Sequence, residues 1–483
     1  MLIVTAPDLL IYRRTKIVAT VGPASNSQDQ ITALIEAGVN VFRINFSHGS
    51  HAAHGAAIAL IRQIAQRLGT PTAILADLCG PKIRTGKFRD GSVELITGST
   101  VTVTSDEVLG DASVIPSQYA ALAQDVLPGN RILLNDGAVE LRVMMVRDHE
   151  VECLVVAGGP VGDHKGINLP GTTVSAPSLT DKDRDDAVFA LAAGVDFIAL
   201  SFVRNGDDIS ALRAIVDAAG SAAGIIAKIE KPEALVNSED IISRADGIMV
   251  ARGDLGVELN PEQVPLAQSQ LITRARQLNK PVIVATQMLE SMITNARPTR
   301  AEVSDVSFAV ASGADAVMLS GESAVGRFPV AAVQMMDRVA RQTEAYYWHA
   351  GVPLHGAHLP AAAPLLFGDA IAHATARLVA DLRARAVIVI SVHGMTAATI
   401  SAARPAAPVV AISSDQQTCR RMSLMWGMIP HYVASVGTEN PNSIARRAAR
   451  ELGLATDGGY VVMVRGFNAD PVINSPSITL LQV

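Results

Sequence analysis

A lysine and a glutamate stand two residues apart at the end of an apolar run. The run GIIAKIEKPEA carries them as Lys228 and Glu230. Alternate residues of a strand project from one face, so an ammonium and a carboxylate would leave a hydrophobic strand side by side. A single pair of this kind is usually a surface ion pair. Its meaning therefore depends on what the neighbouring segments carry.

Two further apolar runs end in polar residues in the same way. The run DGIMVARGD ends in Arg252 and Asp254, and the run PVIVATQM carries Thr286 and Gln287. Each run precedes a helical pattern, and parallel α/β enzymes gather catalytic residues at the carboxyl ends of several strands. The recurrence predicts an enzyme site.

Alternating strand and helix patterns predict the scaffold of this site. Expected helices include 27–37, 180–193 and 261–279, the last with Asn260 as its N-cap and Pro261 at its first position. The expected strands are 16–22, 39–47, 72–78, 195–203, 224–230, 246–254, 281–288 and 315–320. Eight strands within two flanking pieces that together have about 250 residues are typical of a (β/α)8 TIM barrel.

The stretch 79–175 has a different character. Its apolar residues alternate with polar ones, as around Val93 and Val101, and turn signals such as Asp136-Gly137 separate the alternating runs. This pattern predicts a small β-domain with hairpins, inserted after the third barrel strand.

Residues 351–483 predict a C-terminal doubly wound α/β domain, reached through an Ala- and Pro-rich linker at 355–368. Its expected elements are strands 386–392, 408–414 and 458–465 and helices 367–384, 396–403 and 441–452. The predicted domains are therefore the barrel (1–78 and 176–350), the insert (79–175) and the C-terminal domain (351–483).

The composition of the 483-residue chain is typical of a soluble enzyme. Hydrophobic residues make up 49% and charged residues 18%, which is enough to bury a large core. The net charge of −6 and the pI near 6.0 do not suggest a basic surface that binds nucleic acid. The three cysteines form no CxxC pair, the N-terminus is a poor signal peptide, and no apolar run reaches the roughly 20 residues of a membrane span. We expect a cytoplasmic protein with no nucleic-acid and no membrane partner.

The other predicted strand ends complete a set of polar groups. Arg43, Asn45 and Ser47 alternate along the second strand, Asp77 lies at the end of the third, and Ser320 follows the eighth. Carboxylates together with substrate oxygens are suited to Mg²⁺, and cationic side chains are suited to phosphoryl oxygens. The set favours a small phosphorylated acid as substrate.

Seven motifs resemble those of the pyruvate kinase family, in the family's order. They are FRINFSHG, GPKIRTG, KGINLPG, AKIEKPEAL, MVARGDLGVEL, ATQMLESMI and MLSGESAVGRFP. The resemblance covers about 15–350 closely and the C-terminal region more loosely, through RPAAPVVAISS and RRMSLMWGMIP. It implies the last step of glycolysis: Mg²⁺-dependent phosphoryl transfer from phosphoenolpyruvate to ADP, giving ATP and pyruvate, with Mn²⁺ able to replace Mg²⁺. It also implies a homotetramer.

The resemblance implies a role for each residue at a matching position. Glu230 and Asp254 would bind Mg²⁺, and Lys228, expected to be an exposed site charge, would neutralise the migrating phosphoryl group and the enolate oxygen. The other implied roles are phosphate binding by Arg43, carboxylate binding by the backbone around Gly253 and by Thr286, and enolate protonation through water ordered by Thr286 and Ser320. Nucleotide contacts are implied for Asn45 and for Arg84 and Lys165, which lie at the two roots of the insert. The insert would then be a small β-barrel lid that closes over the site.

The resemblance also bears on a monovalent cation. Many pyruvate kinases hold K⁺ at the positions matching Asn45, Ser47, Asp77 and Leu78, with Thr after the aspartate and Glu within GPxIR. Here Leu78 follows Asp77, and Lys82 stands within GPKIR, which is the combination of the K⁺-independent branch. A fixed ammonium near Asp77 would supply the charge of K⁺ and repel a second cation. We expect no requirement for K⁺.

The C-terminal domain carries a possible regulatory signal. The segment SVHGMT runs into a helix N-terminus, which suits a phosphate. The segment resembles the family's site for a phosphorylated allosteric effector, although Val392, His393 and Met395 replace expected residues. Two rival functions remain: another Mg²⁺-dependent barrel enzyme acting on phosphoenolpyruvate or pyruvate, and a catalytically silent metabolite sensor.

Overall fold

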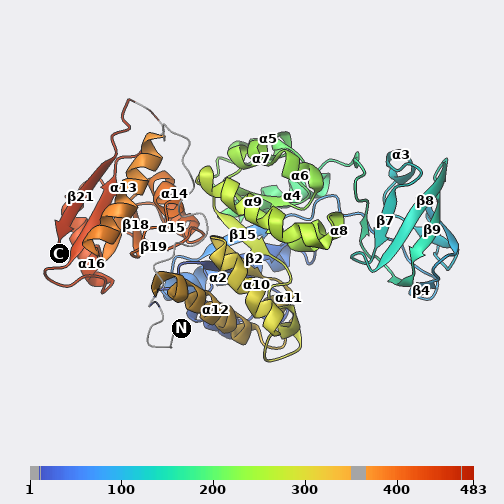
Figure 1. The fold of residues 1–483 in the computed structure, drawn as a ribbon, viewed down its shortest axis with the longest axis horizontal. Coiled ribbons are helices and arrows are strands. Elements are labelled where there is room, and N and C mark those ends of the chain that lie inside the picture. The colour runs from blue at the N-terminus through green and yellow to red at the C-terminus, as the bar shows by residue number, and fades with distance from the viewer. Residues whose placement is uncertain (1–9, 11, 350–365, 469, 471) are drawn as a thin grey trace.

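The computed structural model describes residues 10, 12–349, 366–468, 470 and 472–483. Three bodies lie in a row, with an α/β barrel in the middle (Figure 1). The insert extends from one end of the barrel and the C-terminal domain packs against the other. Most of the expected linker at 355–368 lies outside the described residues.

The central body is a closed barrel of eight parallel strands, as expected. Neighbouring strands pair in the order β1-β16-β15-β14-β13-β12-β3-β2. The strands are β1 (Lys16–Thr20), β2 (Val41–Asn45), β3 (Ala73–Asp77), β12 (Phe197–Leu200), β13 (Gly224–Ile229), β14 (Gly247–Ala251), β15 (Val282–Ala285) and β16 (Ala316–Leu319). The polar residues of the predicted site lie in the last residues of these strands or directly after them, so the barrel gathers those residues at one rim.

The helices of the barrel form its outer layer. They are α1 (Gln28–Glu36), α2 (His51–Arg67), α4 (Asp181–Ala192), α5 (Gly206–Ala218), α6 (Pro232–Val236), α7 (Ser238–Arg244), α8 (Arg252–Glu258), η2 (Pro261–Gln263), α9 (Val264–Gln277), η3 (Glu290–Ile293), α10 (Arg300–Ala311), α11 (Gly321–Ala324) and α12 (Pro329–His349). Asn260 and Pro261 do begin a helical segment, but its first turn is a 3₁₀ turn, and the α-helix starts at Val264.

Two apolar layers make up the barrel core. Side chains between the strands and the outer helices form the larger one. The barrel interior is filled by a second set that includes Val18, Phe197 and Met249. Leu424 of the C-terminal domain belongs to this inner set and is 1% exposed. The C-terminal domain therefore closes the amino-terminal end of the barrel.

The insert curls into a half-barrel around its own apolar core, as the alternating pattern predicted. A six-stranded sheet has the order β11-β7-β8-β9-β5-β6, and β10 pairs with β4. The elements are β4 (Ser92–Leu95), β5 (Thr100–Thr104), β6 (Val114–Pro116), α3 (Leu122–Asp125), β7 (Arg131–Leu134), β8 (Val139–Arg147), β9 (Glu150–Ala157), β10 (Gly159–Gly162) and β11 (Ile167–Asn168).

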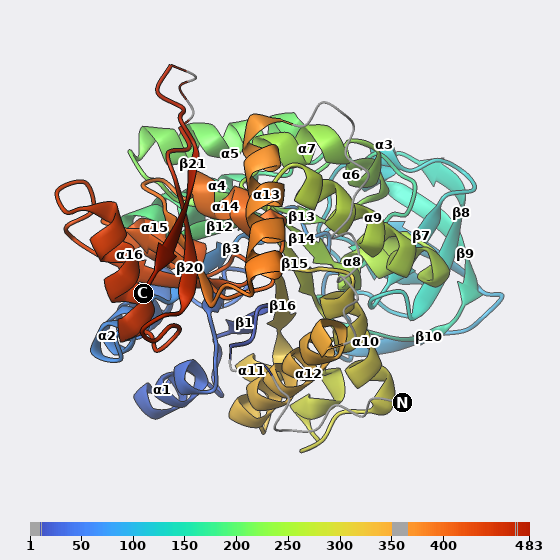
Figure 2. The ribbon, with the colours of Figure 1, turned by 60° about the vertical axis from the view of Figure 1, so that its left-hand side comes forward.

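The C-terminal domain is a mixed sheet with helices on both faces (Figure 2). Its strand order is β19-β18-β17-β20-β21, with β21 antiparallel to β20. The elements are α13 (Phe367–Leu382), β17 (Ala386–Ile390), α14 (Met395–Ala402), β18 (Val409–Ser413), α15 (Gln416–Met422), β19 (Met428–Tyr432), α16 (Pro441–Glu451), β20 (Tyr460–Arg465) and β21 (Ser477–Gln482). Three of these strands were expected from the sequence, whereas the two edge strands were not.

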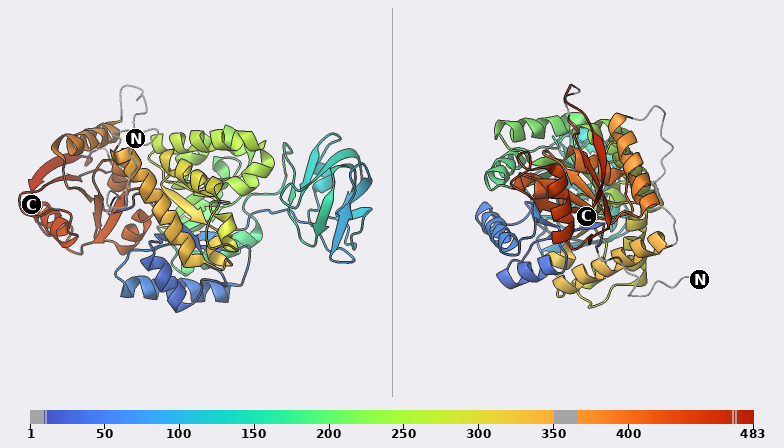
Figure 3. Two further views of the ribbon diagram at one scale, coloured as in Figure 1. Left: turned by 60° about the horizontal axis from the view of Figure 1, so that its bottom comes forward. Right: turned by 90° about the vertical axis from the view of Figure 1, so that its left-hand side faces the viewer.

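The insert and the C-terminal domain occupy opposite ends of the barrel (Figure 3). Lys16, at the start of β1, donates to the carbonyl of Met428 at 2.6 Å, so the C-terminal domain touches the amino-terminal ends of the strands. The insert leaves after β3, at the carboxyl ends. Among the helices of the described residues, none is long and apolar enough to cross a membrane.

Candidate active site

The polar residues of the three apolar runs meet at the carboxyl rim, but not all of them lie on strands. Lys228 is within β13, and Glu230 follows its last residue. Arg252 and Asp254 were expected at the end of a strand. They instead form the first turn of α8, because β14 ends at Ala251 and the helix begins at once.

Thr286 and Gln287 lie beyond the end of β15 in a left-handed turn, with φ of 69° and 54°. A β-branched residue at positive φ is strained, and such strain persists only where the surroundings hold it. Arg252 does so here, since its guanidinium donates to the Thr286 carbonyl at 2.8 Å and pairs with Asp305 at 2.6 Å.

Four charged side chains form a buried cluster at the rim. Arg43 Nε donates to Asp77 Oδ2 at 2.6 Å. The ammonium of Lys228 lies 3.3 Å from Asp77 Oδ1 and 3.0 Å from Glu230 Oε1. Lys228 is 12% exposed and both carboxylates are 1% exposed, so the expectation of an exposed lysine charge is wrong. Its charge is desolvated, and the two carboxylates hold it in place.

The cluster shifts the pKa of Lys228, Asp77 and Glu230. Burial alone would lower the pKa of Lys228, but the charges of Asp77 and Glu230 outweigh it and raise that pKa. Burial would raise the pKa of Asp77, but Lys228 and Arg43 together hold it below its usual value. Lys228 is therefore a fixed positive charge rather than a proton donor near neutral pH.

Glu230 is the electrostatically unsatisfied member of the cluster. Burial raises its pKa, Lys228 opposes this, and the nearby charge of Asp254 adds to the rise. Its Oε2 accepts a hydrogen bond from the backbone N–H of Phe202 at 2.7 Å. A cation between Glu230 and Asp254 would relieve their repulsion.

Thr286 and Gly253 contact each other across the rim. The N–H of Gly253 donates to Thr286 Oγ1 at 2.7 Å, and this hydroxyl donates to the Ala285 carbonyl at 2.7 Å. A β-carbon added at Gly253 would lie 3.5 Å from Thr286 Oγ1, which is an ordinary van der Waals contact, so the Cα of Gly253 faces the Thr286 side chain.

Ser320 follows β16 and precedes α11. Its N–H donates to Glu322 Oε2 at 2.8 Å, and Glu322 Oε1 accepts from the N–H of Leu289. The Ser320 hydroxyl is buried and has no hydrogen-bond partner among the described residues.

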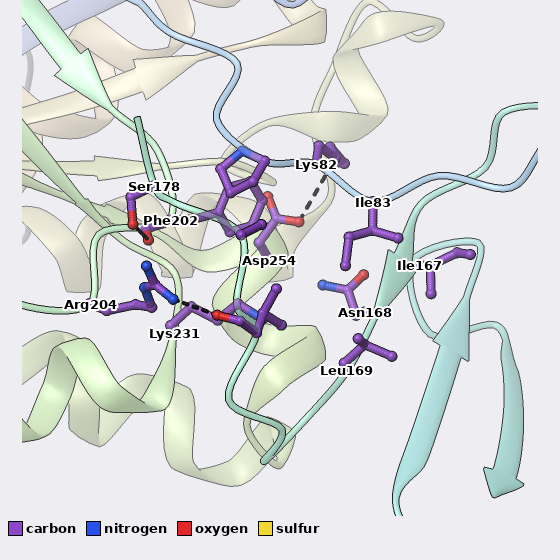
Figure 4. Close-up of a pocket in the computed structure, with 13 residues that line it drawn as sticks. Lys82, Ile83, Ile167, Asn168, Leu169, Ser178, Phe202, Arg204, Lys231 and Asp254 are labelled. Atoms are coloured by element: carbon purple, nitrogen blue, oxygen red, sulfur yellow. Dashed lines mark hydrogen bonds and ion pairs between the residues drawn. The ribbon is translucent and has the colours of Figure 1, made fainter. Parts of the chain in front are cut away.

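A cleft lies between the rim and the roots of the insert (Figure 4). The outgoing root of the insert (82–86) is where the chain leaves the barrel, and the returning root (165–169) is where it comes back. Lys82 of the outgoing root lies 3.6 Å from Asp254 Oδ1 across this cleft. The ammonium was expected near Asp77, but its ion pair is with Asp254, and the cations that pair with Asp77 are Arg43 and Lys228. Asn168, Phe202 and Lys231 also line the cleft.

The remaining predicted residues surround this centre. Asn45 ends β2, and its Oδ1 accepts from the N–H of Ser47 at 3.2 Å. Leu78 is buried, and its carbonyl accepts from Ser201. Arg84 donates to the carbonyl of His164 at 3.1 Å in the paired roots of the insert.

Lys165 follows His164 in the returning root. Its backbone N–H donates to Thr85 Oγ1 at 2.9 Å, and its side chain is exposed. Lys165 and Arg84 are therefore placed at the roots, as expected, where a movement of the insert would carry them.

Sequence reasoning missed three residues that support the centre. Ser201 accepts from the Lys228 ammonium at 2.6 Å and donates to the carbonyl of Leu78 at 2.7 Å. Lys231 and Glu258 form an ion pair at 2.6 Å. Ser201 follows an apolar strand, so the rule that found Thr286 could have found it. Glu258 sits at the end of a helix and carried no such signal.

The fold and the site define a (β/α)8-barrel enzyme with a buried lysine–carboxylate centre at the carboxyl ends of its strands. Family models match in two parts: pyruvate kinase, barrel domain, over residues 12–333, and pyruvate kinase, alpha/beta domain, over residues 369–474. The chain belongs to the pyruvate kinase family.

Individual relatives agree with this assignment over nearly the whole chain. The chain is 44% identical to pyruvate kinase 2 of Synechocystis, covering 94% of this chain and 76% of that one. It is 43% identical to a pyruvate kinase of Geobacillus stearothermophilus, over 98% and 80%. The crystal structure of a pyruvate kinase from Cryptosporidium parvum superposes with a TM-score of 0.88 at 38% identity, covering 97% and 96%.

The family uses a divalent metal, and the residues present fit one. Glu230 and Asp254 are close enough for the charge of one to raise the pKa of the other, which a divalent cation would offset. Among the described residues, no group of three or more His, Cys, Asp and Glu side chains could hold a metal. The ion would therefore also need oxygens from substrate or water, which is how Mg²⁺ is commonly bound.

Proposed function

We propose that this chain catalyses Mg²⁺-dependent phosphoryl transfer from phosphoenolpyruvate to ADP, giving ATP and pyruvate. The observation that carries the proposal is the Lys228 ammonium, held between Asp77 and Glu230 at the rim of a pyruvate kinase barrel. Phosphoryl transfer needs positioned charge more than covalent chemistry, and this ammonium is fixed in position and charge.

Each side chain of the cluster has a part in this reaction. Arg43 binds the phosphate of phosphoenolpyruvate. Lys228 neutralises the migrating phosphoryl group and the enolate oxygen that it leaves. Mg²⁺, held by Glu230 and Asp254, supplies further positive charge when bound. Because Lys228 is already fixed by its carboxylates, little reorganisation is needed as charge develops.

The part of the site around Thr286 binds the carboxylate of the substrate and serves the protonation of the enolate. The backbone around Gly253 and the Thr286 hydroxyl bind the carboxylate, since a side chain at Gly253 would crowd that approach. Thr286 and Ser320 order the water that protonates the enolate. The unpartnered Ser320 hydroxyl supports this role.

The nucleotide enters through the cleft under the insert. Asn45 contacts it from the barrel, and Arg84 and Lys165 contact it from the roots of the insert. Closure of the insert as a lid would bring those two cations toward the phosphates and exclude water.

A coupled assay tests the proposed reaction. Pyruvate formation is measured with phosphoenolpyruvate and ADP, with Mg²⁺, with Mn²⁺ and with chelator. We expect turnover with either metal and loss of it with chelator. Release of inorganic phosphate without ATP would favour another barrel enzyme, and binding without turnover would favour a metabolite sensor.

We also propose that the enzyme works without K⁺. The carbonyl of Leu78 already accepts from Ser201, both oxygens of Asp77 are paired with cations, and the Lys82 ammonium adds charge beside Asp254. A further cation among Arg43, Lys228 and Lys82 would be repelled.

Replacement of K⁺ by tetramethylammonium tests this directly. Activity should stay near its full value, and Lys82→Glu should create a requirement for K⁺. A fall of roughly tenfold in the unmodified enzyme would contradict the proposal, because it corresponds to about 1.4 kcal/mol of lost transition-state stabilisation.

Four further features belong to the same proposal: the effector site, the location, the oligomeric state and the domain boundaries. A phosphorylated effector binds at the turn before α14, where Gly394 has a φ of 91° and Arg421 donates to the carbonyl of His393 at 3.3 Å. The enzyme is a cytoplasmic homotetramer, and the domains divide at 78/79, 175/176 and 350/351. Calorimetry with sugar phosphates and nucleotides, sedimentation equilibrium, and limited proteolysis test the effector, the tetramer and the boundaries in turn.

A further inference from the structure

Both roots of the insert contact the same face of helix α8. Asp254 and Glu258 are four residues apart, so their side chains lie above one another on the helix. Lys82 of the outgoing root lies 3.6 Å from Asp254 Oδ1. Asn168 of the returning root donates from Nδ2 to Glu258 Oε1 at 3.2 Å. One short helix therefore holds one contact from each root.

The contact at Glu258 is the buried one. Its carboxylate is 1% exposed and also accepts from the Lys231 ammonium at 2.6 Å. Lys231 directly follows Glu230, so this ion pair joins the two segments that carry the proposed Mg²⁺ ligands. A buried pair with a short contact is costly to break, because either partner alone would be left as an uncompensated charge.

The contact at Asp254 is looser. Lys82 and Asp254 are 29% and 22% exposed, and 3.6 Å is longer than a hydrogen bond. The two roots are paired with each other, through the N–H of Ile167 to the carbonyl of Ile83 at 2.9 Å and the N–H of Thr85 to the carbonyl of Lys165 at 2.8 Å. They would therefore move as one ribbon, held firmly at Asn168 and loosely at Lys82.

We propose that Asn168, Glu258 and Lys231 are positioning residues that form the pivot of the insert. The buried amide–carboxylate–ammonium contact anchors the paired roots on α8, and the ribbon that they form swings about this contact while the looser Lys82–Asp254 contact changes. The proposal rests on the proposed function for the meaning of this motion, which is delivery of Arg84 and Lys165 to the nucleotide. The pivot then governs ADP binding and leaves the phosphoenolpyruvate and metal contacts in place.

The variant Asn168→Asp tests the pivot. It keeps the shape of the side chain but sets a second carboxylate against Glu258 in a buried place, where like charges repel. The matched control is Asn130→Asp, the same change elsewhere in the insert, where the side chain only accepts from the N–H of Leu127. Thermal melting establishes that both variants fold.

The first readout is hydrogen exchange of the substrate-free protein. We expect Asn168→Asp to speed exchange of the root segments 82–86 and 165–169 by about tenfold, with the C-terminal domain unchanged. Asn130→Asp should match the unmodified protein. This measurement needs no turnover, so it tests the pivot even if the proposed reaction fails in the coupled assay.

The second readout is kinetic. We expect Asn168→Asp to raise the KM for ADP by about tenfold, with kcat, the KM for phosphoenolpyruvate and the affinity for Mn²⁺ each within about twofold. The double variant Asn168→Asp/Glu258→Gln restores one amide and one carboxylate beside Lys231. It should bring the KM for ADP back to within about threefold of the original value.

Two results would overturn the pivot. One is an Asn168→Asp variant with unmodified exchange at the roots and an unmodified KM for ADP. The other is a loss of kcat and Mn²⁺ affinity with normal exchange at the roots, which would make Glu258 and Lys231 part of the metal site instead. Should Asn168→Asp fail to fold, Asn168→Ala, which removes the donor without adding charge, carries the same expectations.

Discussion

Lys228 shows how a single residue can serve the fold and the chemistry together. Its spacing from Glu230 correctly predicted its position at the rim. Residue spacing does not show, however, how deeply a side chain is buried. The exposure was misjudged because the partner that draws the ammonium inward, Asp77, comes from a strand about 150 residues earlier in the chain. Long-range partners of this kind are invisible to a pattern in one segment.

Replacing Lys228 by methionine should abolish turnover and also destabilise the protein. The change leaves the buried carboxylates of Asp77 and Glu230 with less positive charge, which typically costs about 3–5 kcal/mol when one partner of a buried pair is removed. The coupled assay measures turnover and differential scanning calorimetry measures the melting temperature. Near-normal turnover would refute the role, and an unchanged melting temperature would refute the burial argument.

Thr286→Val should lower kcat more than it lowers Mg²⁺ affinity. Valine keeps the branched shape but removes the Oγ1 that accepts from Gly253, and it leaves that N–H without its partner beside the substrate carboxylate. Thr286→Ser keeps the hydroxyl and is the matched control, expected to retain most of the activity. Weakened metal binding with normal kcat in the valine variant would contradict the assignment.

At the scale of elements, sequence periodicity identified the eight barrel strands because buried apolar residues make up most of each one. It placed Arg252 and Asp254 on a strand because it could not show that α8 begins directly after β14. The edge strands β19 and β21 were not predicted from the sequence. β19 contains Pro430, β21 lies at the end of the chain, and each of them pairs with only one neighbouring strand.

The first strand carries an element-scale prediction. Lys16 begins β1 at the amino-terminal end of the barrel, called its floor here. Burial, with a contribution from the charge of Arg13, lowers the pKa of Lys16 to about 7. The charges of Glu344 and Asp315 oppose this shift. Folding therefore disfavours the charged form. Between about pH 7 and 10 the unfolded chain holds a proton that the folded chain has lost, so stability rises with pH across this window.

Lys16→Met should remove this dependence. The free energy of unfolding at pH 7 should increase, and its slope between pH 7 and 9 should fall by up to about 1 kcal/mol per pH unit. Urea unfolding at several pH values measures both quantities. The control is Lys87→Met, at an exposed lysine of the insert, which should leave the slope as it was. An equal slope in the protein and in Lys16→Met would show that Lys16 stays charged in the folded state.

At the scale of the whole molecule, a buried ion pair joins the C-terminal domain to the amino-terminal end of the barrel. Arg404 NH1 lies 2.8 Å from Asp315 Oδ1, with the two side chains 3% and 5% exposed. The same guanidinium donates to the carbonyl of Gly313 at 2.7 Å and lies over the ring of Trp426. Asp315 in turn accepts from the N–H of Val282, at the start of a barrel strand.

Arg404→Met should uncouple the unfolding of the C-terminal domain from that of the barrel. The change removes the cation closest to the buried Asp315 carboxylate, which keeps its backbone donors from Val282 and Trp426, at a cost of about 3–5 kcal/mol at the interface. Calorimetry should then resolve an additional transition at lower temperature. Arg377→Met is the control, because its pair with Asp381 is 80% and 54% exposed and contributes little. A calorimetric trace matching that of the control would mean that packing around Leu424 and Trp426, rather than the ion pair, holds the two domains together.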